Sequence, residues 1–389
     1  PIKKNYSKKL DYDVIIIGGG TSGVQCANEI LNKGKSVALF NYVKPTQHGN
    51  KWELGGTCLN VGCIPKIIFH KTALFGTEFK QMKKLGWDIK NPTFNWTKMV
   101  NRTTSHIKTE SRKIFNGLRR HKKFKYFNHK AKIVSENSVS YSDNDKLQTI
   151  SSKYIIIAVG ERPIMPKIPG IEYAITSDDL FFKKDPPNKT CIVGGGYIAL
   201  EMASCLNDLG YNVTVVVRGI LLRSFDRDCV YGIYKSLKKL GVKLMLGAEV
   251  KELRKNKNNK IKVTIENKNK TSNLLFDTVL YAIGRRRNVD NLYENIKLKT
   301  KENKIVVNGY GQTNISNIYA IGDITNKHNE LATIATKSAH HLANNLFGQK
   351  DYKFNQNRFV PTTIFSSLEY GCIGLTSAEA KNKYKNVSN

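Results

Sequence analysis

The chain lacks the features that mark several broad classes of protein. No apolar run in its 389 residues approaches the roughly 20 residues that a membrane-spanning helix needs. Seven cysteines are too few for a disulfide-stapled scaffold of this length. Acidic residues are scarce, since 31 Asp and Glu stand against 63 Lys and Arg, a formal net charge of +32. We expect no membrane segment, and a hydrophobic content of 40% is typical of a globular protein, here of two or three domains.

Five of the cysteines stand apart in apolar or small-residue contexts: Cys26, Cys191, Cys205, Cys229 and Cys372. We expect these five to be reduced, buried thiols. Reduced, buried cysteines are typical of a cytoplasmic protein, and a mitochondrial form is an alternative.

The positive charge raises the hypothesis of nucleic-acid binding. The lysines are spread along the whole chain, however, and the densest cluster, residues 119–125, has no zinc-finger or RNP-type context. A solvated face is therefore the preferred interpretation, and nucleic acid is not expected as a partner. A positive field can still speed the encounter with an acidic protein substrate.

A glycine-rich turn follows the first apolar strand. The strand runs from Asp13 to Gly18, a helix is predicted over Val24–Asn32, and a second strand over Ser36–Phe40. The glycines have the spacing of a dinucleotide-binding fingerprint: Gly18, Gly20 and Gly23. Glycine at these positions lets the backbone approach a pyrophosphate at a helix N-terminus. A plain tight turn is the alternative.

The same pattern returns after a proline cluster between Pro163 and Gly170. It predicts a strand over Thr190–Val193, a turn over Gly194–Ala199, a helix over Leu200–Leu209 and a strand over Asn212–Val217. Two such units in one chain predict two bound nucleotides.

The remaining segments complete an α/β fold with two Rossmann-like nucleotide-binding domains and inserted antiparallel strands. They are a mostly helical stretch over Gly76–Arg120, a strand over Tyr154–Val159, antiparallel strands over Ile261–Glu266 and Leu274–Ile283, and a helix near Leu331–Leu346. A new strand is expected beyond Arg358. We assign 11–163 and 289–357 to the first domain, 164–288 to the second, and 358–389 to the start of an interface domain.

Cys58 and Cys63, with four residues between them, lie between the two fingerprints. We interpret them as a reversible disulfide beside a flavin. Pro65 and the apolar run after it predict a helix starting just past Cys63. A helix N-terminus lowers a thiol pKa, and Lys66 adds positive charge. Half of a zinc site is the alternative, but no second cysteine or histidine pair follows at suitable spacing, so no metal is expected.

Polar residues near the glycine turns indicate which nucleotides bind. In the first unit Asn41 stands where an acid usually contacts a ribose hydroxyl, and its amide oxygen can still accept a hydrogen bond. The second unit has Arg218 at the corresponding place and Arg223 five residues later. Two guanidiniums can clamp a 2′-phosphate, which favours NADPH over NADH. Two ordinary surface arginines are the alternative.

Three further residues are candidates for the site. Tyr197, inside the second turn, can cover a nicotinamide pocket or only pack. Glu201 is a candidate ion-pair partner for Lys66, against the alternative of two solvated charges. Asp323, after Gly322 at a strand end, can accept a ribityl hydroxyl or cap a helix.

With these motifs, the chain from about Asp11 to Lys383 resembles the high-molecular-weight thioredoxin reductase branch of the pyridine nucleotide–disulfide oxidoreductase family. Three segments favour this branch over glutathione reductase: the long loop 43–56, the arginine spacing of 217–226, and the first interface-domain strand in 367–376. The resemblance implies FAD in the first domain and NADPH in the second. It also implies that electrons pass from NADPH through FAD to the Cys58–Cys63 disulfide and then to thioredoxin.

The resemblance implies a role for each candidate residue. Cys58 would be the interchange thiol and Cys63 the thiol in charge-transfer contact with the flavin, with Lys66 and Glu201 beside it and Tyr197 as its gate. The implied FAD-binding residues are Gly18, Gly20, Thr21, Ser22, Gly23, Asn41, Tyr42, Gly56, Thr57, Cys58, Lys66, Val159, Gly160, Gly322, Asp323 and Leu331. The implied NADPH-binding residues are Gly194, Gly196, Tyr197, Ile198, Arg218, Arg223 and Arg285.

The chain departs from the family pattern at Asn41, Val159, Gly219 and Ala332-Thr333. The family completes its site with a histidine–glutamate pair and, in this branch, a C-terminal redox pair, both supplied by the partner subunit of a homodimer. The chain reaches Asn389 without them, and His340 and His341 do not match the motif. We therefore expect a C-terminally truncated fragment that binds nucleotides but does not turn over thioredoxin alone.

Two other interpretations stay open. One is a fused thioredoxin–glutathione reductase, or a glutathione reductase. The other is a catalytically silent nucleotide- or RNA-binding protein, which predicts salt-sensitive RNA binding and no release of thiols by NADPH.

Overall fold

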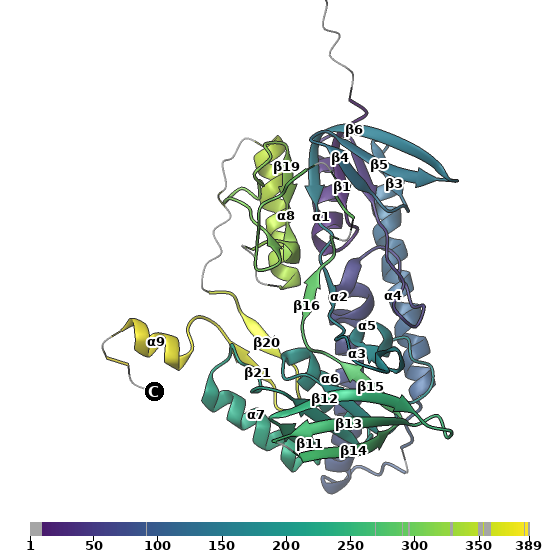
Figure 1. Ribbon diagram of the computed structural model, residues 1–389, viewed down its shortest axis with the longest axis vertical. Coiled ribbons are helices and arrows are strands. Elements are labelled where there is room, and N and C mark those ends of the chain that lie inside the picture. Colours follow the sequence, from purple (N-terminus) through teal and green to yellow (C-terminus); the bar gives the residue numbers. More distant parts are fainter. Residues whose placement is uncertain are drawn as a thin grey trace, which may run out of the picture.

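A computed structural model describes residues 10–90, 92–268, 270–289, 291–294, 296–326, 330–348, 353, 359–384 and 386–387. Two sheets lie at opposite ends of an elongated molecule, with the long helices α3 (Cys63–Lys84) and α4 (Trp96–Arg119) running between them (Figure 1). Among these described residues, no helix combines the length and the apolar character needed to cross a membrane.

The first sheet has the strand order β3-β2-β1-β6-β5-β4, and β19 also pairs with β6. Its strands are β1 (Tyr12–Ile17), β2 (Val37–Phe40), β3 (Phe124–Phe127), β4 (Lys132–Ser135), β5 (Ser138–Asp143), β6 (Lys146–Ile157) and β19 (Ile318–Ala320). The pairs that join β1, β2, β3, β6 and β19 are parallel, whereas β4, β5 and β6 are antiparallel. Residues 14–17 of β1 are apolar without alternation because both faces of the strand are covered.

Two helices cover one face of this sheet, together with the last turn of α4. α1 (Thr21–Asn32) follows β1 directly, and α8 (Ala332–Phe347) packs beside it. α2 (Gly56–Val61) leads through Gly62 into α3.

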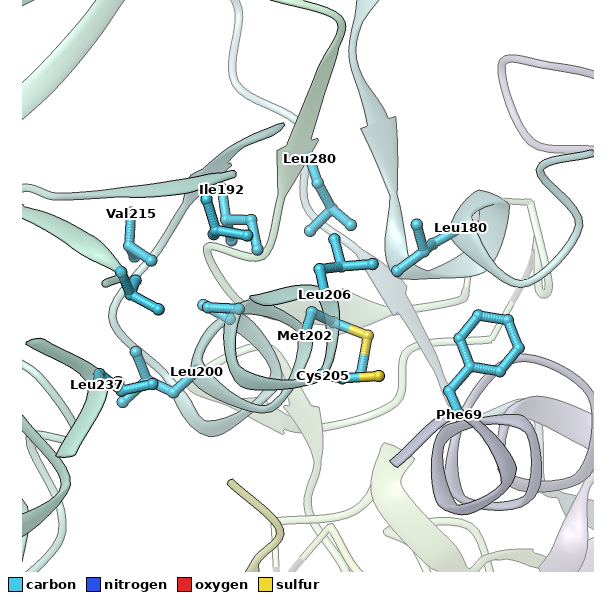
Figure 2. Packing of buried hydrophobic residues seen from close by; sticks show 14 of the residues in the cluster. Phe69, Leu180, Ile192, Leu200, Met202, Cys205, Leu206, Val215, Leu237 and Leu280 are labelled. Carbon is cyan, nitrogen blue, oxygen red and sulfur yellow. The ribbon is translucent and has the colours of Figure 1, made fainter. Parts of the chain in front are cut away.

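The second sheet is parallel throughout, in the order β11-β10-β9-β15-β8. Its strands are β8 (Ile175–Thr176), β9 (Thr190–Val193), β10 (Val213–Val217), β11 (Lys243–Leu246) and β15 (Thr278–Tyr281). α6 (Tyr197–Asp208) and α7 (Arg227–Lys239) pack on it, and α5 (Ser177–Leu180) follows β8. Figure 2 shows Met202 and Leu206 of α6 among Ile192 and Leu280 of the sheet and Phe69 of α3. The core of the second sheet thus extends to the helix that starts at Cys63.

A three-stranded antiparallel sheet lies beside it, made of β12 (Ala248–Lys255), β13 (Ile261–Asn267) and β14 (Lys270–Phe276). The prediction of one antiparallel strand over Leu274–Ile283 is wrong, because that segment divides at Asp277 into β14 and the parallel β15. Asp277 makes the break, since its carboxylate accepts the Lys189 N–H at 3.1 Å and the Lys260 ammonium at 3.0 Å.

Other element boundaries differ from the predicted ones. α1 begins at Thr21 rather than Val24, and α6 at Tyr197 rather than Leu200, because Gly20 and Gly196 already serve as the helix N-caps. The stretch 76–120 contains a break between α3 and α4, and β6 extends far before Tyr154 as part of an unpredicted hairpin with β5.

Three of the five separate cysteines are buried as predicted, since Cys26, Cys191 and Cys205 are at most 2% exposed. The prediction of buried thiols is wrong for Cys229, which is exposed, and for Cys372, which is half-buried. α7 turns Cys229 away from its buried face, which is formed by Val230, Ile233 and Leu237.

Short pieces join the two halves and carry the end of the chain. β7 (Glu161–Pro163) pairs with β16 (Arg285–Arg287) where the chain passes between the sheets. β17 (Thr300–Lys301) and β18 (Lys304–Ile305) form a two-stranded antiparallel ribbon. The 3₁₀ helix η1 (Ile171–Tyr173) precedes β8, and the 3₁₀ helix η2 (Gly322–Ile324) follows β19. β20 (Thr362–Ile364), β21 (Tyr370–Cys372) and α9 (Ser377–Lys383) follow. The predicted domain boundary at 357/358 lies outside the described residues.

Candidate active site

A cavity of about 1010 Å³ opens at the carboxyl ends of β1 and β6. Its wall contains most of the residues implied to bind FAD: Gly18, Gly20, Thr21, Ser22, Asn41, Tyr42, Gly56, Thr57, Cys58, Lys66, Val159, Gly160, Asp323 and Leu331. The remaining two, Gly23 and Gly322, lie behind the wall. A Cβ on Gly23 would sit 1.8 Å from the Gly18 carbonyl oxygen, so this glycine serves close packing of α1 on β1.

The turn itself requires glycine. Gly18 has φ +116°, and a Cβ there would lie 2.3 Å from the Ala158 carbonyl oxygen. Gly56 packs directly against Gly20, since a Cβ on Gly56 would lie 2.6 Å from the Gly20 Cα. Asn41 holds the turn from the side, since its Oδ1 accepts the Gly19 N–H at 3.3 Å.

Five helices whose first turns lie at a cavity wall start without a side-chain cap. They are α1, α2, α3 and α8 at the first cavity and α6 at a second cavity. By contrast α4, α5 and α7 have capped starts, since Asn95 accepts the Lys98 N–H, Thr176 and Asp179 form a capping box, and Asp226 accepts the Asp228 N–H. Uncapped N–H groups and the helix dipole favour an anion such as a pyrophosphate.

Cys58 in α2 and Cys63 at the start of α3 are unlinked thiols that share a hydrogen bond. Both line the cavity, and Cys63 is exposed there. The hydrogen bond from Cys58 and the Lys66 charge lower the pKa of Cys63 to about 7, against the opposing effect of burial. The same hydrogen bond, with burial, raises the pKa of Cys58. Cys63 is therefore the sulfur that ionises first.

Lys66 and Glu201 form an ion pair at 3.3 Å, with Glu201 only 5% exposed. Phe365, just after β20, contacts both members of the pair. Its backbone N–H donates to Glu201 Oε1 at 2.9 Å, and its ring centroid lies 3.7 Å from the Lys66 Nζ. Burial raises the pKa of Glu201, and the Lys66 charge opposes this. The two charges are thus held together beside Cys63 by a residue from the end of the chain.

Asp323 lines the cavity directly after Gly322, which packs against Ser22, and burial raises the pKa of its carboxyl. Lys304 holds this segment, since its ammonium donates to the Asp323 carbonyl at 2.6 Å, to Glu330 Oε1 at 2.9 Å and to the buried Glu161. Within the described residues, no group of three or more His, Cys, Asp or Glu side chains is placed to hold a metal ion.

A second cavity, of about 880 Å³, opens at the carboxyl ends of β9 and β10. Gly194, Gly196, Arg218 and Arg223 line it as predicted. A Cβ on Gly219 would lie 3.1 Å from an Arg223 terminal nitrogen, so glycine leaves room for that guanidinium. Arg218 is 83% exposed and pairs with Glu249 at 3.5 Å. An acid therefore lies beside the arginines, which the sequence did not indicate.

The two cavities meet at Tyr197, Glu330, Leu331 and Thr363, which line both. Two residues implied to bind NADPH, Ile198 and Arg285, line the first cavity and not the second. For Arg285 the reason is β16, which pairs with β7 and returns the chain to the first sheet. Its guanidinium donates to the Glu161 carbonyl at 2.8 Å and to Thr57 Oγ1 at 3.2 Å.

Glycine turns at two cavities, an adjacent cysteine pair and a charged pair beside it define a nucleotide-dependent disulfide oxidoreductase. The chain belongs to the pyridine nucleotide-disulphide oxidoreductase family, which it matches over residues 12–339.

Among its relatives, a thioredoxin reductase of Plasmodium falciparum (isolate FCH-5) is 41% identical over 383 residues, 96% of this chain and 70% of that protein. A thioredoxin reductase of isolate 3D7 is also 41% identical, over 96% of this chain and 61% of that protein. Mitochondrial thioredoxin reductase 2 of Drosophila melanogaster is 36% identical over 96% of this chain and 73% of that protein. The chain thus spans 61 to 73% of these relatives.

A solved structure has the same fold. The HOCl-induced flavoprotein disulfide reductase RclA of Escherichia coli, in a Cu(II) complex, superimposes with a TM-score of 0.83 at 25% identity. The match covers 96% of this chain and 79% of that one. This agrees with a mixed α/β fold of parallel sheets with antiparallel inserts.

Sequence reasoning missed four residues that the fold brings to the site: Thr363, Phe365, Lys304 and Glu161. Glu161 follows Gly160 in a Gly-Glu-Arg-Pro turn, a local signal that could have included it. Phe365 has no such signal, because only the return of β20 to α3 and α6 places it there.

Proposed function

We propose that the chain is an NADPH-dependent flavoprotein disulfide reductase acting on thioredoxin, with FAD in the first cavity and NADPH in the second. The observation that carries this proposal is the Cys58–Cys63 pair on the wall of the cavity formed by the Gly18–Ser22 turn and Asp323. The uncapped start of α1 and the bare backbone of Gly20 and Gly56 fit a dinucleotide pyrophosphate.

Bound FAD supplies the chemistry that side chains lack, since it accepts a hydride from NADPH and delivers two electrons to a disulfide. The chain contributes binding and orientation. The Gly18–Ser22 turn would hold the pyrophosphate and Asp323 a ribityl hydroxyl. Arg223 and Arg218, on the wall of the second cavity, would hold the 2′-phosphate of NADPH by charge-assisted hydrogen bonds.

Tyr197 lies where the two cavities meet, and its side chain is 39% exposed. In that place it would close the path between nicotinamide and flavin until NADPH enters. Its movement would leave the rest of α6, including the buried Glu201, in place.

Reduction of the disulfide by two electrons and two protons leaves two thiols. Cys63 releases its proton first, because Lys66 and the hydrogen bond from Cys58 stabilise its thiolate. Cys58 keeps its proton, since its pKa is raised, so its attack on a substrate disulfide requires a base. The family resemblance assigns that base to the second subunit of a homodimer.

Thioredoxin is supported as the substrate by the 36 to 41% identity to thioredoxin reductases. A net charge of +32 also suits an acidic protein partner. The chain spans only part of the length of these relatives. Turnover of thioredoxin and formation of a dimer are therefore proposals.

A thiol count tests the core reaction. FAD-loaded protein is oxidised, made anaerobic and mixed with one equivalent of NADPH, and free thiols are alkylated and mapped by mass spectrometry. We expect Cys58 and Cys63 to become alkylated, and far less so with NADH. If the flavin is reduced while the link between Cys58 and Cys63 persists, the proposed electron route is wrong.

A further inference from the structure

One face of α6 carries three polar side chains that meet the segment after β20. They are Glu201, Ser204 and Asp208, spaced three and four residues apart, so they lie in one row along the helix. Glu201 is 5% exposed and Ser204 is fully buried, on a helix whose neighbouring residues are otherwise core. Buried polar groups of this kind need hydrogen-bond partners, and residues 365–367 supply them.

Each of the three side chains accepts one hydrogen bond from this segment. The Phe365 N–H donates to Glu201 Oε1 at 2.9 Å, the Ser367 N–H to Ser204 Oγ at 2.5 Å, and the Ser367 hydroxyl to Asp208 Oδ2 at 2.5 Å. The hydroxyls of Ser204 and Ser367 are also hydrogen-bonded. Since the Ser367 proton goes to Asp208, Ser204 is the donor between the two hydroxyls. Ser204 thus both donates to Ser367 and accepts from it.

Residues 365–367 lie between β20 and β21, where the strand pairing of the hairpin has ended. The N–H groups of Phe365 and Ser367 therefore bond to side chains of α6 instead of to a neighbouring strand. Further along, Glu369 Oε1 lies 3.0 Å from Nε2 of His70, a residue of α3 that is 2% exposed. The connection between β20 and β21 is thus fixed to both α6 and α3.

The fixed segment ends at the cysteine pair. The Phe365 ring centroid lies 3.7 Å from the Lys66 Nζ, and Lys66 is three residues after Cys63. Any shift of residues 365–367 along α6 would move this ring from the ammonium.

We propose that Ser204 is a positioning residue for the reduction of the Cys58–Cys63 disulfide, because it fixes residues 365–367 on α6 and thereby holds the Phe365 ring against Lys66. The reaction named here rests on the proposed function. Ser204 itself is on the wall of neither cavity, so it acts through Ser367 and Phe365.

Hydrogen exchange tests the attachment. In chemically reduced, FAD-loaded protein, Ser204→Ala should speed exchange of the Ser367 amide about tenfold, because its acceptor is lost. Ser338→Ala is the matched control, since Ser338 is a buried serine of α8 whose hydroxyl donates to the Ala335 carbonyl at 2.9 Å. That control should leave the Ser367 amide as it is in the parent.

A pH profile tests the effect on the cysteine. The midpoint for alkylation of Cys63 by iodoacetamide should rise in Ser204→Ala by up to about one pH unit, because the cation beside the thiolate is less well held. Phe365→Leu should raise it in the same direction. The double variant should show no further rise, since both changes act through one ring contact.

A Ser204→Ala variant that is destabilised in urea but keeps the parental Cys63 midpoint would overturn the proposal, and so would additive shifts in the double variant. If Ser204→Ala does not fold, Ser367→Ala provides the same two readouts from a half-buried position. Neither readout requires NADPH. If NADPH leaves the Cys58–Cys63 link of the parent intact while Ser204→Ala still shifts the midpoint, the proposed function is contradicted and the action of Ser204 on Lys66 stands.

Discussion

At the scale of single residues, the charges around Cys63 determine which sulfur ionises. Lys66 is the nearby cation, and it is held by Glu201 on one side and by the Phe365 ring on the other. A cation over an aromatic face gains about 0.5–2 kcal/mol, more when it is shielded from water. The position of the ammonium, and with it the pKa of Cys63, therefore depends on all three residues.

The first prediction concerns pH. In reduced protein, alkylation of Cys63 by iodoacetamide should follow its thiolate, so the rate rises with pH and levels off above a pKa of about 7. Below that pH the rate should fall about tenfold per pH unit. Lys66→Met should move the midpoint to higher pH because the stabilising charge is lost. A Cys63 midpoint in the ordinary thiol range in the unmodified protein would contradict this.

The second prediction concerns Phe365. Phe365→Leu keeps the backbone N–H on Glu201 but removes the ring from Lys66, so the alkylation midpoint of Cys63 should rise by less than about one pH unit. Phe365→Tyr should restore it, since the ring face is retained. Phe359→Leu is a matched control, because Phe359 is 71% exposed in the same segment. Equal midpoints in all three variants would show that the ring plays no part.

At the scale of elements, the candidate site residues lie at the N-termini of helices and at the carboxyl ends of strands. The sequence predicted both βαβ units and the cysteine helix because glycine spacing and apolar runs are local signals. It misjudged Leu274–Ile283, since two strands of different sheets follow each other there with only Asp277 between them. It missed Phe365, because the position of this residue depends on how the segment after β20 packs, which no local pattern encodes.

The third prediction tests the packing of α1 on β1. Gly23→Ala places a Cβ against the Gly18 carbonyl, so it should destabilise the protein by at least about 1–3 kcal/mol. Gly117→Ala, in the last turn of α4 with no atom within 4 Å of the added Cβ, should instead stabilise it by up to about 0.5–1 kcal/mol. Urea denaturation of both variants measures this. A Gly23→Ala variant as stable as the parent would contradict the close approach of turn and helix.

At the scale of the whole molecule, two cavities at separate sheets meet around Tyr197, Glu330, Leu331 and Thr363. The second sheet shares its core with α3, which starts at Cys63, so the two nucleotide sites are built on one continuous interior. The chain has a net charge of +32, which favours the binding of anionic ligands and of acidic partners.

The fourth prediction concerns the choice of nucleotide. Arg223→Gln should weaken binding of NADP⁺ by about 10- to 100-fold and leave NAD⁺ unchanged, because only the 2′-phosphate loses a charge-assisted bond. Arg218→Gln should have a smaller effect, since Arg218 is exposed and already paired with Glu249. Arg119→Gln, on α4, is the control. Calorimetric titration measures all three, and equal losses for NADP⁺ and NAD⁺ would argue against a phosphate clamp.

The most direct test of the central claim is an anaerobic NADPH titration of FAD-loaded protein, followed by absorption spectroscopy. If the Cys63 thiolate lies against the flavin, a long-wavelength band should appear as the disulfide opens. Cys58→Ser should show the band without NADPH, and Cys63→Ser should lack it. Full reduction of the flavin with no such band in the parent protein, or an unchanged spectrum in Cys63→Ser, would contradict the assignment of Cys63 as the sulfur that faces the cofactor.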